Sequence, residues 1–110
     1  MNLPEESTLM RIYVGESDRD DGKPLYESLV LKAREAGLAG ATAVRGFMGF
    51  GASSHLHTAK ILRLSFDLPV VIEIVDTKAK IEAFLPTVDG MIKGGMVTVE
   101  PVRVAVYRHP

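Results

Sequence analysis

The segment that most restricts the fold of this chain is 70–75, VVIEIV, which is apolar on both alternating faces except at Glu73. A strand with this profile is buried on both sides, so the segment is predicted to lie at the centre of a sheet. A carboxylate there needs a partner or an opening, because an unpaired buried charge is costly. Glu73 is therefore expected either to form a structural ion pair or to face a site.

Two amphipathic helices are predicted from the hydrophobic periodicity on either side of the glycine-rich middle of the chain. Pro24 is well placed to start the first helix, and Gly37 to cap its C-terminus. The second helix follows the capping residues Asp76 and Thr77, and Pro86 is expected to kink or break it. Further strands are predicted at 9–14, 41–47, 61–66 and 96–107, with Pro101 at a bulge or an edge of the last one.

This order of elements predicts an α+β fold of the ferredoxin-like βαββαβ type, a split βαβ sandwich with an antiparallel sheet and two helices on one face. The length favours a single domain over 1–110, with a flexible lead at 1–7 and a long glycine-rich loop at 46–60. The strands carry apolar residues on both faces, whereas two helices cover only one. A closed homo-oligomer with clefts between protomers is expected to bury the other face.

The composition disfavours several classes of partner and site. A formal net charge of −1 argues against nucleic acid as a partner. The lack of cysteine excludes disulfides, thiolate metal sites and cysteine nucleophiles. The first twenty residues hold acids and no continuous apolar run, so neither a secretion signal nor membrane insertion is expected, and the expected location is cytoplasmic.

A glycine-rich segment, ATAVRGFMGFGASSHLHTAK at 41–60, carries the strongest functional signal. Glycines at 40, 46, 49 and 51 give it backbone freedom to approach a ligand closely. The side chains around these glycines include donors suited to an anion, namely Arg45, Ser53, Ser54, His55, His57, Thr58 and Lys60. We interpret the segment as a phosphate-accepting loop; the alternative is a flexible hairpin with incidental basic residues.

The chain resembles the signalling protein PII, and resembles small PII-like relatives more closely. The similarity to PII lies in GLAGATAVRGFMGFG (37–51), HT (57–58) and DLPVVIEIVD (67–76). The relatives share RIYVGES (11–17), GKPLYESLVLKAREAGLAGAT (22–42) and HTAKILRLSFDLPVVIEIVD (57–76). The resemblance implies a homotrimer with an adenine nucleotide, AMP, ADP or ATP, in the clefts between subunits, which Mg²⁺ can accompany. It also implies that the 46–60 loop signals occupancy to a regulated protein, an enzyme or a transporter.

Particular residues take roles from this resemblance. Gly49, Phe50 and Gly51 look like the GFG at the base of the long loop of PII, where main-chain amides face phosphate. Thr42 matches a strand threonine near the base of that loop, and Glu73 and Val75 match central-strand positions that line the nucleotide pocket. The end of the first strand borders the same cleft with Gly15 and Glu16, and the predicted nucleotide-binding set also includes Gly46 and His57. The second glycine turn, GGMVTVEP, lacks the lysine that PII uses for phosphate and has only Lys93 before it, so neutralisation is assigned to Arg45, Lys60, Arg63 or Arg103. The stretch between His57 and Glu73 is shorter than in PII and has no tyrosine, so no target for tyrosine modification is expected there.

Two other functions compete with nucleotide sensing. His55 and His57 are two positions apart, so on a strand they would face the same way and could clip a divalent metal. Glu73 with His57 is the one acid–base pair that could support slow nucleotide hydrolysis. No nucleophile spacing or Walker-type lysine accompanies that pair, so the protein is not expected to be an enzyme.

Overall fold

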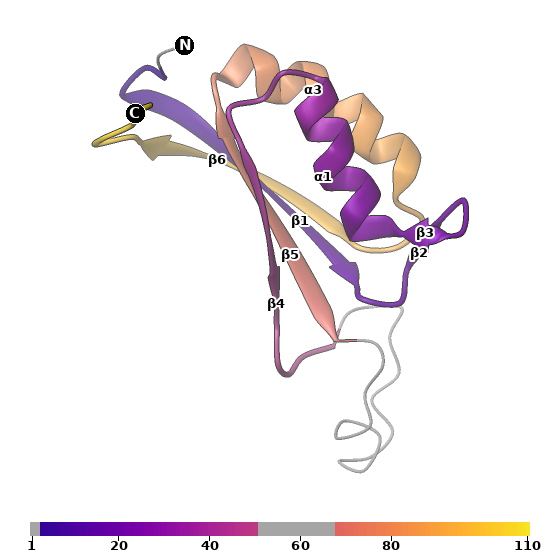
Figure 1. Cartoon of the computed structure of the whole chain (residues 1–110). Helices are drawn as coiled ribbons and strands as arrows, with labels where there is room; N and C mark the ends of the chain where they lie inside the picture. Colours follow the sequence, from indigo (N-terminus) through magenta and orange to yellow (C-terminus); the bar gives the residue numbers. More distant parts are fainter. Residues whose placement is uncertain (1–2, 51–67) are drawn as a thin grey trace.

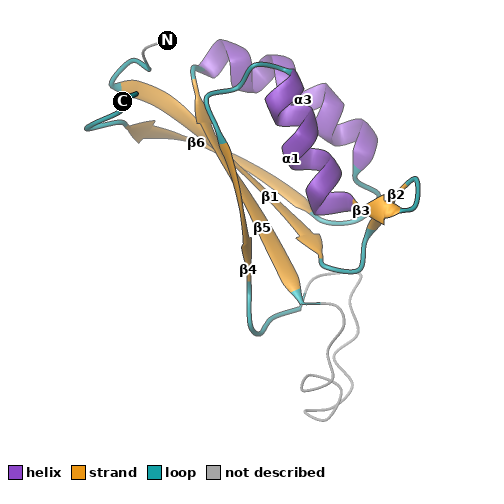
Figure 2. Ribbon diagram, in the orientation of Figure 1, coloured by secondary structure: helices purple, strands orange, loops and turns teal. Residues whose placement is uncertain are grey.

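The computed structural model describes residues 3–50 and 68–110. Its main sheet has four antiparallel strands in the order β4-β5-β1-β6, and both helices lie on one face of it (Figures 1 and 2). The sheet and its helices comprise β1 (Glu6–Gly15), α1 (Leu25–Glu35), β4 (Ala41–Arg45), β5 (Pro69–Asp76), α3 (Lys78–Met91) and β6 (Met96–Arg103). The predicted α+β sandwich of the ferredoxin-like type is confirmed.

The predicted central strand is β5, which pairs with β4 on one side and β1 on the other. Its alternation places Val70, Ile72 and Ile74 on the helix-covered face, where all three are buried. They lie opposite Val14, Ile12 and Met10 of β1, and these two rows form the floor of the core. The helices close the core from above with Leu25, Leu29, Ala33, Ile81, Phe84 and Val88.

The helix boundaries follow the expected signals, with one correction. Pro24 directly precedes α1, and Gly37 follows its end with a φ of 76°, a backbone conformation that glycine adopts without strain. Thr77 caps α3, its Oγ1 accepting a hydrogen bond from the N–H of Lys80 at 3.2 Å. Of the kink or break expected at Pro86, the break is wrong, because α3 continues through the proline to Met91. Burial of Phe84 and Val88 against the sheet on both sides of the exposed proline outweighs the loss of one helical hydrogen bond.

Several strand boundaries differ from the predicted ones. β1 begins at Glu6 rather than residue 9, since its ladder with β6 extends to the pair of Glu6 and Arg103. β4 ends at Arg45 instead of residue 47, and β6 at Arg103 instead of 107. Pro101 lies in β6, an edge strand, as predicted. Between β1 and α1 the chain forms a short hairpin of β2 (Arg19–Asp20) and β3 (Lys23–Pro24). The predicted strand 61–66 lies outside the described residues.

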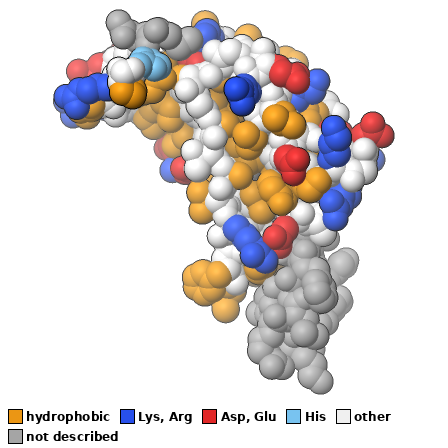
Figure 3. Space-filling model, in the orientation of Figure 1, with side chains coloured by type: hydrophobic (Ala, Val, Ile, Leu, Met, Phe, Trp, Pro, Cys, Tyr) orange, Lys and Arg blue, Asp and Glu red, His pale blue; other side chains and the backbone are white. Residues whose placement is uncertain are grey.

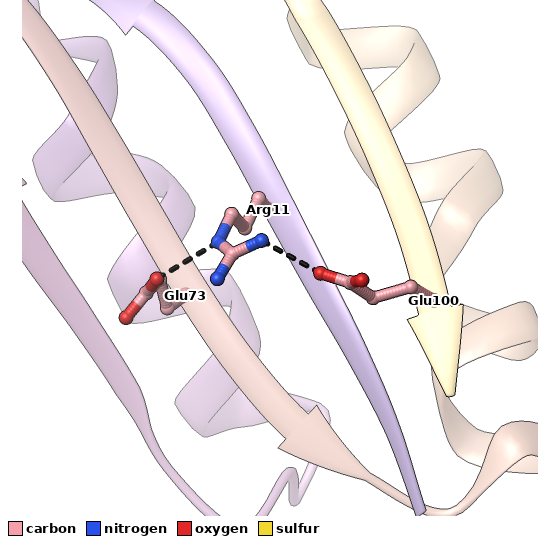
Figure 4. Close-up of polar contacts among 3 residues, drawn as sticks. All are labelled: Arg11, Glu73 and Glu100. Atoms are coloured by element: carbon pink, nitrogen blue, oxygen red, sulfur yellow. Dashed lines mark hydrogen bonds and ion pairs between the residues drawn. The ribbon is translucent and has the colours of Figure 1, made fainter. Parts of the chain in front are cut away.

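The second face of the sheet is not covered by the helices. The residues that alternate with the core positions point to this side, and they are mostly half-buried apolar side chains interrupted by charges. The row nearest the middle contains Tyr13, Val71 and Val75 together with Arg11 and Glu73. Figure 4 views this face with the helices behind the strands. Within the described parts of the chain, none of the helices has the length and hydropathy that a membrane span requires.

Candidate functional site

Three chain segments meet at one end of the sheet, where β1 and β4 end and β5 begins. The N–H of Gly46 donates to the carbonyl oxygen of Pro69 at 2.7 Å, and the N–H of Glu16 donates to the carbonyl oxygen of Leu68 at 2.8 Å. These bonds fix the positions after β4 and after β1 on opposite sides of the same strand. The sequence predicts nucleotide binding by a set that includes Gly15, Glu16, Arg45, Gly46, Gly49 and Phe50, and these six residues lie at this end of the sheet.

An ion pair crosses the start of β5 at this end. Arg45 Nε lies 3.0 Å from Glu16 Oε2, although β4 and β1 are not neighbours in the sheet. Arg45 lies in register with the core residue Val70, so its side chain extends on the helix side of the sheet, and Glu16 directly follows the end of β1. The side chain of Arg45 is 61% exposed and that of Glu16 only 26%. The guanidinium is therefore the accessible member of the pair.

The connection after β4 packs its glycines against β5 and exposes its apolar side chains. A Cβ added to Gly46 would lie 2.8 Å from Pro69 Cγ, and one added to Gly49 would lie 3.1 Å from it. Phe47 is 90% exposed and Phe50 is 73% exposed, which is unusual for aromatic residues. Hydrophobic atoms project at the lower end of the molecule in Figure 3, where Figure 1 shows the connection that follows β4. Gly46 and Gly49 thus pack closely against Pro69, while the side chains of Phe47 and Phe50 are accessible to solvent.

The second glycine turn approaches the same end of the sheet from α3. Gly95 has a φ of 134°, and a Cβ at this position would overlap the carbonyl oxygen of Tyr13 in β1. Next to this turn is an open hollow of about 290 Å³, lined by Asp18, Arg19, Leu25, Met91, Lys93 and Gly94. Lys93 therefore lies near the end of β1, on the side of the helices.

A separate charged cluster occupies the uncovered face of the sheet. Arg11 Nε donates to Glu73 Oε2 at 2.9 Å, and Arg11 Nη1 donates to Glu100 Oε1 at 2.7 Å (Figure 4). Thr42 of β4 lies directly opposite Glu73 in the register. The hydrogen bond that Arg11 donates to Glu73 is the main cause that raises the pKa of Arg11 above its usual value, so the guanidinium remains charged. Of the two expectations for Glu73, the structure shows the ion pair.

Several residues that the sequence predicts to bind nucleotide do not lie at the glycine-lined end of the sheet, where Gly46 and Gly49 pack against Pro69. Arg103 pairs with Glu5, Nε to Oε2 at 3.2 Å, and lies opposite Glu6. At about 3.3 Å of rise per residue, that position is roughly 30 Å along β1 from Gly15. The other unplaced candidates, Gly51, His55, His57, Lys60 and Arg63, lie outside the described residues. In the ranges 3–50 and 68–110, no group of three or more His, Cys, Asp or Glu side chains could hold a metal ion.

Sequence reasoning missed three side chains that organise these regions. Asp18 Oδ2 accepts the N–H of Gly15 at 2.9 Å and so holds the turn after β1. An aspartate three residues after a glycine at a strand end is a local signal that could have indicated this turn. Arg11 and Glu100 left no such signal, because they meet through strand pairing between distant segments.

Comparison with known proteins assigns the chain to a family. The family model described as "Uncharacterized ACR, COG1993" (DUF190) matches residues 7–104. A UPF0166 protein of Aquifex aeolicus (strain VF5) is 40% identical over 96 residues, covering 87% of this chain and 90% of its own. A UPF0166 protein of Methanocaldococcus jannaschii is 31% identical over 100 residues, covering 90% and 92%.

Solved structures show the same fold at lower sequence identity. CPII of Thiomonas intermedia K12, bound to ADP and bicarbonate, superposes with a TM-score of 0.58 at 19% identity and covers 92% of this chain and 90% of its own. CPII bound to ADP, AMP and acetate gives 0.56 at 18% identity with the same coverage. A third CPII structure, described as a nitrogen regulatory PII-like protein, gives 0.51 at 16% identity, covering 94% and 97%. The chain therefore belongs to the DUF190 family and has the PII-like fold.

Proposed function

We propose that this protein is a PII-like regulator that binds an adenine nucleotide between the protomers of a homotrimer. In this proposal the 46–60 loop signals occupancy to a regulated enzyme or transporter in the cytoplasm. The observation that carries the proposal is the fold match over 92% of the chain to CPII, whose structure holds ADP. The glycines and Arg45, selected independently from the sequence, lie together at one end of that fold.

The chemistry of this end suits a phosphate group. Arg45 presents a largely exposed guanidinium with five N–H donors, and Glu16 pairs with it at Nε alone. Gly46 and Gly49 keep the main chain close to β5, where a larger residue would displace it. A nucleotide in this region would meet a fixed cation and a close backbone, which are the features that phosphate recognition uses.

The uncovered sheet face supports the trimer. Its half-buried apolar side chains would be shielded from water by further copies of the chain, which create the proposed clefts. Arg103 lies too far from Arg45 to share a ligand within one protomer, so in this proposal it contributes from a neighbouring subunit. The location of Arg103 is thus compatible with a site formed by two protomers.

Ligand-dependent melting tests the proposal directly. AMP, ADP, ATP and cyclic AMP, each at about 1 mM with and without Mg²⁺, are added separately before thermal unfolding. A ligand at 100 times its Kd adds about 2.7 kcal/mol, which raises the Tm of a domain this size by about 10 °C or more. Unchanged melting with all four nucleotides would contradict nucleotide binding tighter than millimolar.

The oligomer and the lack of catalysis are tested separately. Native mass spectrometry is expected to give about 36 kDa, three times the 12.0 kDa chain, and a 12.0 kDa species alone at micromolar concentration would contradict the trimer. We propose that the protein is not an enzyme. Incubation with ATP and Mg²⁺ for a day is expected to release no phosphate above buffer, and steady release would contradict this assignment.

A further inference from the structure

Glu16 is an acidic residue at the glycine-lined end, and its negative charge opposes that of a phosphate. Its carboxylate lies 3.0 Å from the Arg45 guanidinium and is the less exposed member of the pair. Its backbone is fixed by the hydrogen bond to Leu68, and the preceding Gly15 is held by Asp18. The backbone that carries the carboxylate is therefore held by hydrogen bonds at this end of the sheet, and the carboxylate itself pairs with Arg45.

The pair changes the electrostatics that a ligand meets. Without Glu16, Arg45 would present a full positive charge, whereas the pair as a unit is neutral. A phosphate that accepts a hydrogen bond from the same guanidinium would bring its charge within about 6–8 Å of the Glu16 carboxylate, where repulsion between like charges is substantial near a protein surface. The repulsion increases with each negative charge that the ligand carries.

We propose that Glu16 limits the phosphate charge that this site accepts and so sets its preference among adenine nucleotides. This inference rests on the proposed nucleotide function and deepens it. Wild-type protein favours AMP and ADP over free ATP, because the additional phosphate brings charge that the neutral pair does not compensate. A divalent cation bound to the ATP phosphates neutralises part of that charge and so reduces the difference in affinity between ATP and the other two nucleotides.

The test is a binding series with a charge-neutral variant. Calorimetric titration of AMP, ADP and ATP in the presence of EDTA is compared for wild type and Glu16→Gln, which keeps the size and the acceptor oxygen. The expected gain in affinity is about threefold for AMP and about tenfold or more for ATP. Mg²⁺ is expected to reduce the gain for ATP. Glu16→Ser repeats the measurement with a side chain that cannot contact the guanidinium.

A matched control separates this local effect from net charge. Glu35→Gln changes the net charge equally, but Glu35 lies in the last turn of α1 and pairs with Lys32, so its nucleotide affinities are expected to stay at wild-type values. An equal loss of affinity for all three nucleotides in Glu16→Gln would show that Glu16 only positions Arg45, and would overturn the inference. A uniform gain, or none, would overturn it as well. Absence of binding by wild type and both variants would overturn the proposed function itself, and the inference with it.

Discussion

Arg11 on β1 and Glu73 on β5 form an ion pair, Nε to Oε2 at 2.9 Å, in the middle of the sheet face that the helices leave uncovered. The second hydrogen bond of Arg11, to Glu100 on β6, makes the guanidinium a bridge across three strands (Figure 4). The charged groups of this cluster, on an otherwise mostly apolar face, are thus already paired within one protomer. A second copy could cover this face without leaving an isolated carboxylate in the interface.

Removal of the bridging guanidinium tests whether this face is covered. Arg11→Met would leave Glu73 and Glu100 without their cation in the interface, so the trimer is expected to dissociate at a protein concentration at least about tenfold higher than wild type. Sedimentation or light scattering over a dilution series measures this. Lys78→Met breaks an exposed pair with Glu82 on α3 and is expected to leave assembly unchanged. Dissociation of both variants at the same protein concentration would indicate that this face is exposed to solvent and not buried in an interface.

Gly95 is predicted to be essential for stability, since the turn before β6 allows no side chain there. A Cβ would overlap the carbonyl oxygen of Tyr13, and the φ of 134° disfavours other residues. Gly95→Ala is expected to lower the free energy of unfolding by about 2–4 kcal/mol, measured by urea denaturation at one protein concentration. Gly90→Ala, in α3 with open space around the position, is expected to raise it by about 0.5–1 kcal/mol. Similar effects of both changes would contradict the close approach of the turn to β1.

The fold could be predicted because its signals are local. Alternation in 70–75 and the helical stripe through Ile81, Phe84 and Val88 each specify one buried face, and the element order leaves few topologies. Proline alone predicts a kink or a break at position 86, but α3 is unbroken there because the apolar stripe on both sides packs in the core.

The candidate site was predictable only in part, because charge does not reveal position. Arg45 was placed correctly beside the glycines, since it directly precedes them in sequence. Arg103 was grouped with it on charge alone, and the register places it at the far end of the sheet. The partners of Arg11 are 62 and 89 positions away in sequence, so only the strand pairing brings the cluster together.

Asp76 is predicted to stabilise the fold as a buried polar link. Its side chain is fully buried at the end of β5 and accepts hydrogen bonds from the N–H groups of Ala39, at 2.8 Å, and Thr77, at 2.6 Å. Asp76→Ala would leave these donors unsatisfied and is expected to cost about 2–3 kcal/mol of unfolding free energy at neutral pH. Asp89→Ala, an exposed change on α3, is expected to stay within about 0.5 kcal/mol of wild type. A small effect at Asp76 would mean that water replaces the carboxylate.

The base of the glycine-rich connection is predicted to matter for ligand binding more than for stability. Gly46→Ala would place a methyl group 2.8 Å from Pro69 Cγ, so β4 and β5 must shift apart where Arg45 is held. Because the shift lies at the end of the ladder, we expect a loss of about 1 kcal/mol in stability. The guanidinium moves with the strand end, so nucleotide affinity is expected to fall by about tenfold.

Gly40→Ala, at the other end of β4 with nothing within 4 Å, is the matched control and is expected to bind as wild type does. Calorimetric titration of both variants with the nucleotide that wild type binds most tightly measures this difference. Equal affinity in the two variants would place the ligand away from the Gly46 end, even if their melting temperatures differ.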